Sequence, residues 1–240
     1  MTDLLPADRP WLHGVVYVEH DRDAHRLDGY PVIGVTSALQ LAGKSADFSK
    51  ANPAALETAR QVGTAVHLAA HYHDEDDLRP GTVDELIVAR LDAWKSFRAN
   101  YAIVPALRET VVVSRKYGYI GRFDRLFLSG STRHVIADIK TGDPASAAAH
   151  LQLSLYETAL IEEIQFYADY FPSLMTSALE SLLAGTIERW SVRLLKTGRY
   201  KVTRYPESPR TKAQDRAEAR LAVGDARVLR GLPERPEKAA

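Results

Sequence analysis

The middle of the chain contains three runs of alternating and β-branched residues, separated by short turns. This pattern predicts β-strands over residues 110–117, 119–128 and 133–140, joined as an antiparallel meander. In the third run the residues around Asp138 are almost all apolar, which is typical of a strand buried within a sheet. The meander is therefore expected to form the centre of the fold.

Apolar residues at helical spacing predict helices before and after this meander. Asn52-Pro53 is a typical helix start, and the T-x-x-E sequence at Thr82 is a capping box that would open the next helix. Residues 73–80, between these two helices, are acidic and are expected to form an exposed connector. The predicted helices span residues 54–72, 83–100, 146–167, 161–183 with a break at Pro172, and 211–229.

The two ends of the chain predict shorter elements. Thr36 or Ser37 is expected to cap a short helix over residues 38–42. Further strands are expected over residues 15–19 and 25–27, which form a hairpin, and over 31–35, 190–195 and 200–205. This mixture of strands and helices predicts an α/β fold, and 240 residues suffice for a single domain.

We expect this domain to span residues 1–230. Residues 1–50 would hold the N-terminal hairpin and short helix, 51–205 the core, and 206–230 a basic C-terminal helix. Residues 231–240 are rich in proline and charge and are predicted to be a disordered tail.

The composition excludes several kinds of chemistry. The chain has no cysteines, so disulfides, cysteine-ligated metals and a cysteine nucleophile are excluded, and a reducing cytoplasm would suit it. No apolar run approaches the roughly 18 residues of a membrane span. The first residues also lack the pattern of a secretory signal, so we expect a cytoplasmic protein without a membrane partner.

The charge is balanced overall but unevenly distributed. Residues 189–230 contain twelve Lys and Arg against four Asp and Glu. Such an excess suits a polyanionic partner, and it is equally typical of a solvated helix face.

Two carboxylates and a lysine are predicted to meet at one edge of the meander. Asp124 lies on the second strand, and Asp138 and Lys140 lie at the end of the third, where side chains two residues apart share a face. Burying these charges is costly unless they are paired or bind a metal. Together they predict a divalent-metal site with a lysine beside it, whereas each taken singly could be part of a surface ion pair.

Gly121-x-x-Asp124, Asp138-x-Lys140 and Gln152-x-x-x-Tyr156, in this order, resemble the signature of the PD-(D/E)XK nuclease superfamily. The chain looks most like the RecB-like and phage-type exonuclease branch. Asp138 begins the only D/E-x-K sequence and Gln152 the only Q-x-x-x-Y sequence in the chain.

Two earlier segments strengthen the resemblance. Gly63-x-x-x-His67 is similar to the metal-binding histidine motif of this branch. Residues 27–39 resemble the N-terminal segment of phage-type exonucleases and of mitochondrial genome-maintenance exonuclease relatives. The absence of cysteines sets the chain apart from Cas4-like relatives and excludes their iron–sulfur lobe.

The resemblance implies a restriction-endonuclease-like mixed sheet flanked by helices, with an N-terminal β-hairpin. It also implies a site that uses Mg²⁺ or Mn²⁺. The expected metal ligands are His67, Asp124, Asp138 and the Ile139 carbonyl, with Glu109 as a further acidic residue. Lys140 would orient or deprotonate the attacking water. Gln152 and Tyr156 would position the site and the DNA backbone, and Thr36 and Ser37 are candidate DNA contacts.

The expected function is that of a metal-dependent DNA exonuclease of the recombination, repair or phage type. Such an enzyme, bacterial or phage-encoded, would act on linear ends or single strands and could work with a single-strand-annealing or other recombination partner. The alternatives are an endonuclease on the same fold, restriction-like or structure-specific, a non-catalytic nucleic-acid-binding module, and another metallohydrolase. The oligomeric state is left open.

Overall fold

The computed structural model describes most of the chain. The described residues are 15–17, 25–27, 29–45, 51–79, 81–129, 133–142, 148–170, 173, 175–206 and 208–233. The predicted first hairpin turn, the break at Pro172 and residues 234–240 of the predicted tail lie outside them.

Eight strands and six helices form within the described residues. The strands are β1 Val15–Tyr17, β2 His25–Leu27, β3 Tyr30–Gly34, β4 Pro105–Ser114, β5 Tyr119–Ser129, β6 Arg133–Lys140, β7 Thr186–Leu194 and β8 Tyr200–Arg204. The helices are α1 Val35–Leu41, α2 Pro53–Asp74, α3 Glu85–Tyr101, α4 Ala149–Tyr170, α5 Ser177–Ala184 and α6 Pro209–Leu229.

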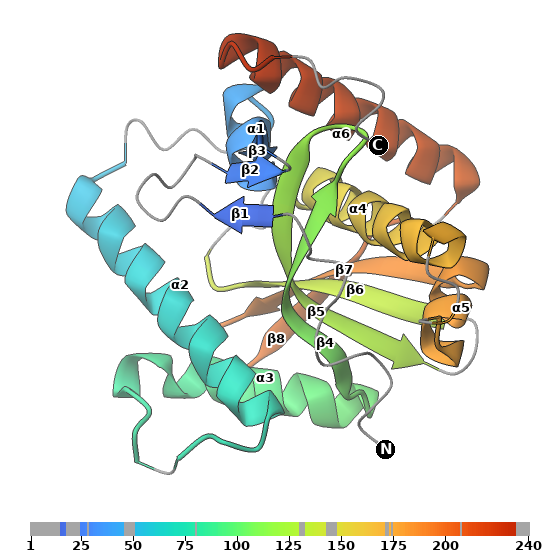
Figure 1. Ribbon diagram of the computed structural model, residues 1–240. Coiled ribbons are helices and arrows are strands. Elements are labelled where there is room, and N and C mark those ends of the chain that lie inside the picture. The colour runs from blue at the N-terminus through green and yellow to red at the C-terminus, as the bar shows by residue number, and fades with distance from the viewer. Residues whose placement is uncertain are drawn as a thin grey trace.

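The strands form one mixed sheet in the order β1-β2-β3-β5-β6-β7-β8, with β4 paired to β5 (Figure 1). The antiparallel β4-β5-β6 meander and the β1-β2 hairpin are confirmed, whereas β3 runs parallel to β5 and β6 parallel to β7. Along one edge of β5, β3 pairs with Tyr119 and Ile120, while β6 pairs only from Arg125 onward. The sheet therefore splits beside residues 121–124, where β3 and β6 diverge.

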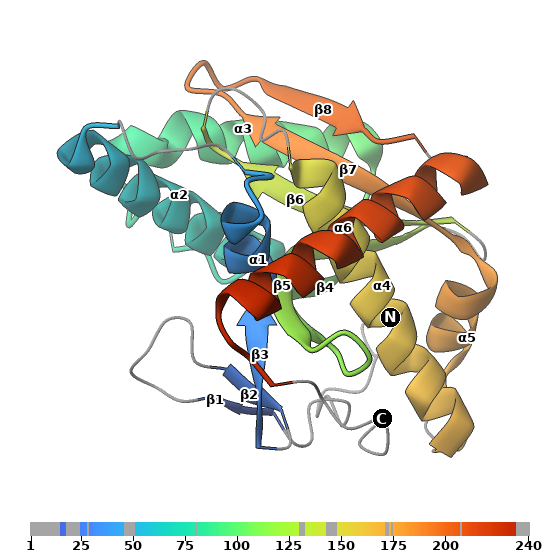
Figure 2. The same cartoon turned by 90° about the horizontal axis from the view of Figure 1, so that it is seen from above.

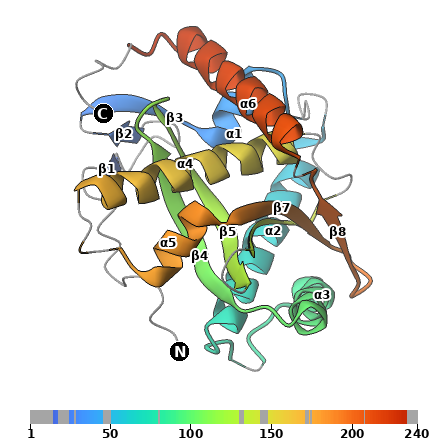
Figure 3. The same ribbon diagram turned by 90° about the vertical axis from the view of Figure 1, so that its right-hand side faces the viewer.

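Helices cover both faces of the sheet, which confirms the α/β class (Figures 1 and 3). One core joins α1, α4, α5 and α6 to one face, and a second joins α2 and α3 to the other. Alternation along β6 divides its side chains between them, since Ile136 faces the first core and Val135 and Ala137 the second. Helix α6 lies against α1 and α4, as Figure 2 shows.

The starts of two helices differ from the expectation. The N-cap of α1 is Gly34, so Thr36 and Ser37 lie inside the first turn and the predicted cap was wrong. Strand β3 runs directly into this helix, which leaves no loop for a side-chain cap. Helix α3 is capped by Asp84, whose carboxylate accepts the Leu86 N–H at 2.8 Å, so the predicted capping box at Thr82 was also wrong. An ionised Asp there also suits the positive end of the helix.

Two segments that were expected to be exposed make contacts with the rest of the protein. Asp74 was placed in the exposed acidic connector, but α2 continues to Asp74 and its side chain is completely buried. At the C-terminus, Leu232 packs against the first core and the Pro233 carbonyl accepts a hydrogen bond from Arg227, so the predicted disorder is wrong for residues 231–233. None of the helices in the described part of the chain is long and apolar enough to cross a membrane.

Candidate active site

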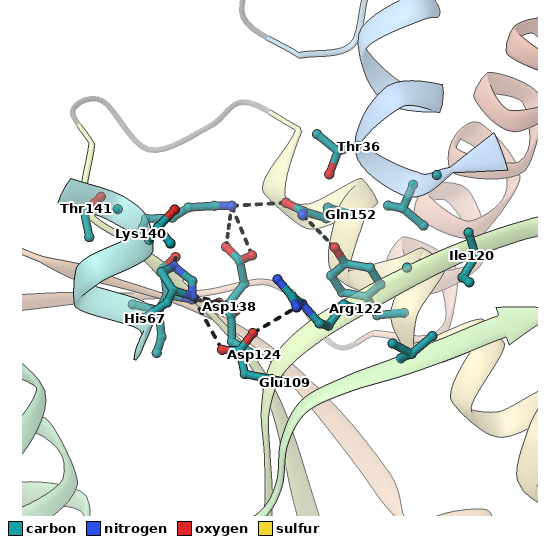
Figure 4. A pocket seen from close by; sticks show the side chains of 18 of the residues that line it. Thr36, His67, Glu109, Ile120, Arg122, Asp124, Asp138, Lys140, Thr141 and Gln152 are labelled. Carbon is teal, nitrogen blue, oxygen red and sulfur yellow. Dashed lines mark hydrogen bonds and ion pairs between the residues drawn. The ribbon is translucent and has the colours of Figure 1, made fainter. Parts of the chain in front are cut away.

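A pocket of about 890 Å³ opens where the sheet splits. Elements α1, α2, β4, β5, β6 and α4 contribute to its lining (Figure 4). Every residue that was predicted for the site lines this pocket: Thr36, Ser37, His67, Glu109, Asp124, Asp138, Ile139, Lys140, Gln152 and Tyr156. The fold thus brings together residues from six elements that are up to 120 positions apart.

Three of these side chains form a compact cluster of oxygen and nitrogen ligands. His67 Nδ1 lies 3.3 Å from Asp124 Oδ1 and 3.6 Å from Glu109 Oε1. One ligand atom from each of the three residues lies within 4.8 Å of the others, so together they could hold one metal ion. Asp138 does not belong to this compact group but lies beside it (Figure 4).

Glu109 adopts an unusual backbone conformation. Its φ is 45°, although Arg108 and Thr110 on either side pair regularly with β5. Left-handed backbone at a residue with a side chain costs about 1–3 kcal/mol and persists only where the surroundings enforce it. Here the strained residue supplies a carboxylate to the ligand cluster. Backbone strain of this kind is usually found at active sites and ligand-binding sites.

Asp124 joins the diverging strands β5 and β6. Its Oδ2 accepts the Ile139 N–H at 2.5 Å, beyond the point where the two strands pair. The Ile139 carbonyl lies 3.1 Å from His67 Nε2, which acts as the donor of this hydrogen bond because a carbonyl can only accept. The backbone of Ile139 therefore orients both Asp124 and the imidazole, with His67 Nδ1 turned toward the carboxylates.

The close packing of charges shifts several pKa values. Burial lowers the pKa of His67, but the carboxylates of Asp124 and Glu109 outweigh it and raise this pKa to about 10. Burial, reinforced by the charge of Asp124, raises the pKa of Asp138 to about 6 despite the opposing effect of Lys140. Burial likewise acts to raise the pKa of Asp124, but protonated His67 and the Ile139 N–H bring it below the ordinary value. The carboxylates thus create a potential that strongly attracts positive charge.

A chain of hydrogen bonds runs along the other wall of the pocket. Lys140 Nζ lies 2.8 Å from Asp138 Oδ2 and donates to Gln152 Oε1 at 3.2 Å. Gln152 Nε2 in turn donates to the Tyr156 hydroxyl at 2.8 Å. Gln152 and Tyr156 share one face of α4, as expected from their spacing of four residues.

The sequence reasoning missed one charged residue of the pocket. Arg122 Nε lies 3.4 Å from Glu109 Oε2, and the Arg122 side chain is 66% exposed. Its position two residues before Asp124 on β5 puts it on the same face of that strand, a signal that could have identified it.

Part of the basic C-terminal segment forms ion pairs inside the protein. Arg189 is fully buried and pairs with Asp215 at 2.9 Å, while Lys212 and Arg216 pair with the buried Glu157 at 2.9 and 3.2 Å. These ion pairs attach α6 to the sheet and to α4. Three of the twelve cations are therefore engaged internally, whereas six others are exposed: Lys196, Arg199, Lys201, Arg204, Arg210 and Arg230.

Asp124, Asp138 and Lys140 meet in the pocket where the mixed sheet splits, as the resemblance to PD-(D/E)XK nucleases led us to expect. The family model of the PD-(D/E)XK nuclease superfamily matches residues 37–227. The chain belongs to this superfamily.

The match to solved structures is more distant. A crystal structure from Eubacterium rectale titled "Putative exonuclease" is 10% identical in sequence, with a TM-score of 0.45, and the alignment covers 84% of this chain and 82% of that one. No curated protein gives a significant sequence match.

Proposed function

We propose that this protein is a metal-dependent DNA exonuclease that hydrolyses phosphodiester bonds. The observation that carries the proposal is the convergence of the ligand cluster His67, Glu109 and Asp124 with Asp138 and Lys140 in one pocket. Membership of a nuclease superfamily makes phosphodiester hydrolysis the chemistry to which this arrangement is suited.

The cluster has donors that fit a divalent cation. His67, Glu109 and Asp124 would hold the ion, with Asp138 beside them. Carboxylate oxygens suit Mg²⁺ and Mn²⁺, and the imidazole nitrogen favours Mn²⁺. The raised pKa of His67 supports the fit, because it reports a potential that a bound cation would relieve. When bound, such an ion polarises the phosphate and lowers the pKa of a coordinated water.

The other residues would orient the substrate and offset its charge. The Lys140 ammonium can reach a phosphate oxygen or the attacking water while Asp138 and Gln152 restrict its position. Tyr156 holds Gln152 in place, and Arg122 at the exposed rim offers a second cation for the DNA backbone. Thr36 and Ser37, in the first turn of α1, are proposed as further contacts to the DNA.

The size of the pocket favours a strand end as substrate. A volume of about 890 Å³ is within the range of about 300–1,000 Å³ that small-molecule ligands fill. We propose that a few nucleotides at the end of a strand occupy this pocket. A role in recombination or repair, with a single-strand-annealing or similar partner, is the biological setting that we propose on the resemblance to phage-type exonucleases.

A nuclease assay tests the proposal. Its substrates are end-labelled linear duplex, end-labelled linear single strand and covalently closed circular DNA, and each is incubated with Mn²⁺, Mg²⁺ or chelator. We expect metal-dependent release of label from linear DNA and intact circles, with Asp124→Asn as a folded inactive control. Cleavage of closed circles would instead identify an endonuclease. Binding of DNA without cleavage would indicate a non-catalytic module, and turnover of small phosphoesters alone another metallohydrolase.

A further inference from the structure

A fully buried arginine lies directly behind the ligand cluster. Arg125 follows Asp124 on β5, and its side chain has no solvent exposure. Its Nη1 donates to Glu109 Oε1 at 3.0 Å and to the Asp124 carbonyl at 2.6 Å. One guanidinium therefore holds the side chain of one candidate ligand residue and the backbone of another.

Asp74, at the C-terminal end of α2, holds Arg125 in turn. The Asp74 carboxylate accepts hydrogen bonds from Arg125 Nε at 2.6 Å, Arg98 Nη1 at 2.7 Å and Trp94 Nε1 at 3.0 Å. The Trp94 ring also packs against the guanidinium, with Arg125 Cζ 5.5 Å from the ring centroid. The plane of Arg125 is thus set by contacts from α2 and α3, on the side away from the pocket.

The charges alternate from the helices to the pocket. Asp74 is negative, Arg125 positive and Glu109 negative, and a cation in the cluster would be positive again. An ionised carboxylate has about four lone-pair positions, so Glu109 can accept from Arg125 and still offer an oxygen to a metal. Asp74 shares its charge between Arg125 and Arg98, so it offsets part of the charge of Arg125. This leaves Glu109 more of its negative potential toward the cation.

We propose that Asp74 and Arg125 are positioning residues of the metal site, which fix Glu109 in its left-handed conformation with the carboxylate toward His67 and Asp124. The inference rests on the proposed metal-dependent function. Residues that orient metal ligands in this way typically contribute about 10–100-fold to metal affinity. Loss of the Asp74 charge would leave Arg125 to pair with Glu109 alone and would draw that carboxylate away from the cation.

The chain supplies a matched control. Arg189 is also fully buried and pairs with Asp215 at 2.9 Å, but this pair joins β7 to α6 and neither residue lines the pocket. Asp215→Asn therefore removes the same carboxylate charge from an equally buried arginine. It reports the general cost of breaking such a pair.

Calorimetry provides the test: Mn²⁺ is titrated into the wild type, Asp74→Asn and Asp215→Asn. Thermal melts of the same three proteins without metal measure their stability. We expect about 10–100-fold weaker Mn²⁺ binding for Asp74→Asn. Asp215→Asn should bind as the wild type does, although both variants melt at a lower temperature.

Arg125→Lys serves as a second variant if Asp74→Asn does not fold, since lysine keeps the charge but cannot contact Asp74 and Glu109 together. It should also weaken Mn²⁺ binding. Unchanged Mn²⁺ affinity in a folded Asp74 or Arg125 variant, or an equal loss in Asp215→Asn, would overturn the positioning role while leaving the proposed function intact. A wild type that binds no Mn²⁺ would refute both.

Discussion

The ring of Tyr156 packs directly against the Cα of Gly121, where a methyl group would not fit. A Cβ at this position would overlap Tyr156 Cε1 and approach Cγ2 of Val35 too closely. Gly121 begins the stretch of β5 where the sheet splits, so the helix that carries Gln152 and Tyr156 can approach the strand that carries Asp124. The glycine of the G-x-x-D sequence is thus explained by the distance between a helix and a strand.

Gly121→Ala should destabilise the protein and reduce cleavage together. Overpacking of this kind costs about 1–3 kcal/mol, and displacement of Tyr156 would release Gln152 from its hydrogen bond. Chemical denaturation and cleavage rates measure the two effects. Gly224→Ala on α6 is the control, because a Cβ there meets nothing within 4 Å and should stabilise the helix by about 0.5–1 kcal/mol. Normal stability of Gly121→Ala would contradict the packing argument.

Lys140→Ala should abolish most of the cleavage without preventing DNA binding. Removal of a charge that stabilises the transition state typically lowers the rate by about 10²–10³-fold. Single-turnover cleavage measures the loss, and fluorescence anisotropy with chelator present measures binding. Lys196→Ala, in the exposed turn before β8, should behave as the wild type. Comparable turnover of Lys140→Ala and wild type would remove Lys140 from the mechanism.

Binding of Mn²⁺ should release about one proton near neutral pH. The pKa of His67 is raised to about 10, so the imidazole is protonated at pH 7, whereas a metal ligand must be neutral. The apparent Mn²⁺ affinity should therefore rise about tenfold per pH unit between about pH 6.5 and 8. Calorimetry in buffers of different ionisation enthalpy measures the proton release directly. His67→Gln should bind Mn²⁺ more weakly and lose this release, and an unchanged proton count in that variant would argue against His67 as the source.

Glu163 should make the protein less stable as the pH rises through neutrality. Burial raises the pKa of this α4 carboxyl to about 8, although the Val113 N–H donates to it at 2.6 Å. Its ordinary value of 4.5 applies to the unfolded chain, so between these two values the folded state holds a proton that the unfolded state has released. The contribution of this group is complete below about pH 4.5 and is lost toward pH 8, at up to about 1.4 kcal/mol per pH unit.

Urea denaturation of wild type and Glu163→Gln from pH 5 to 9 tests this expectation. The neutral amide should flatten the pH dependence and make the variant the more stable protein at pH 9. Glu180→Gln, at an exposed position of α5, should retain the slope of the wild type. If Glu163→Gln retained that slope as well, another group would have to account for it.

Local patterns were sufficient to predict the central elements of this protein. The meander, the main helices and the α/β class follow from apolar periodicity, which acts over neighbouring residues and needs no knowledge of distant contacts. The order of Asp124, Asp138, Lys140 and Gln152 on strand, strand and helix was likewise visible in the sequence. Because side chains alternate on strands and repeat every turn on helices, their faces could be assigned before their neighbours were known.

Other features depend on which distant segments meet. Asp74 lies in an acidic stretch that suggests an exposed connector, yet it is buried because Arg125, Arg98 and Trp94 converge on it from two other elements. The left-handed backbone of Glu109 and the neutralisation of Arg189 by Asp215 are equally invisible in local composition. A charge in water and a charge in a buried pair have the same sequence signal, since only the tertiary structure determines the partner and the dielectric around it. The sequence by itself thus determined the elements and the reactive groups, and the tertiary structure decided which charges face the pocket and which support it from behind.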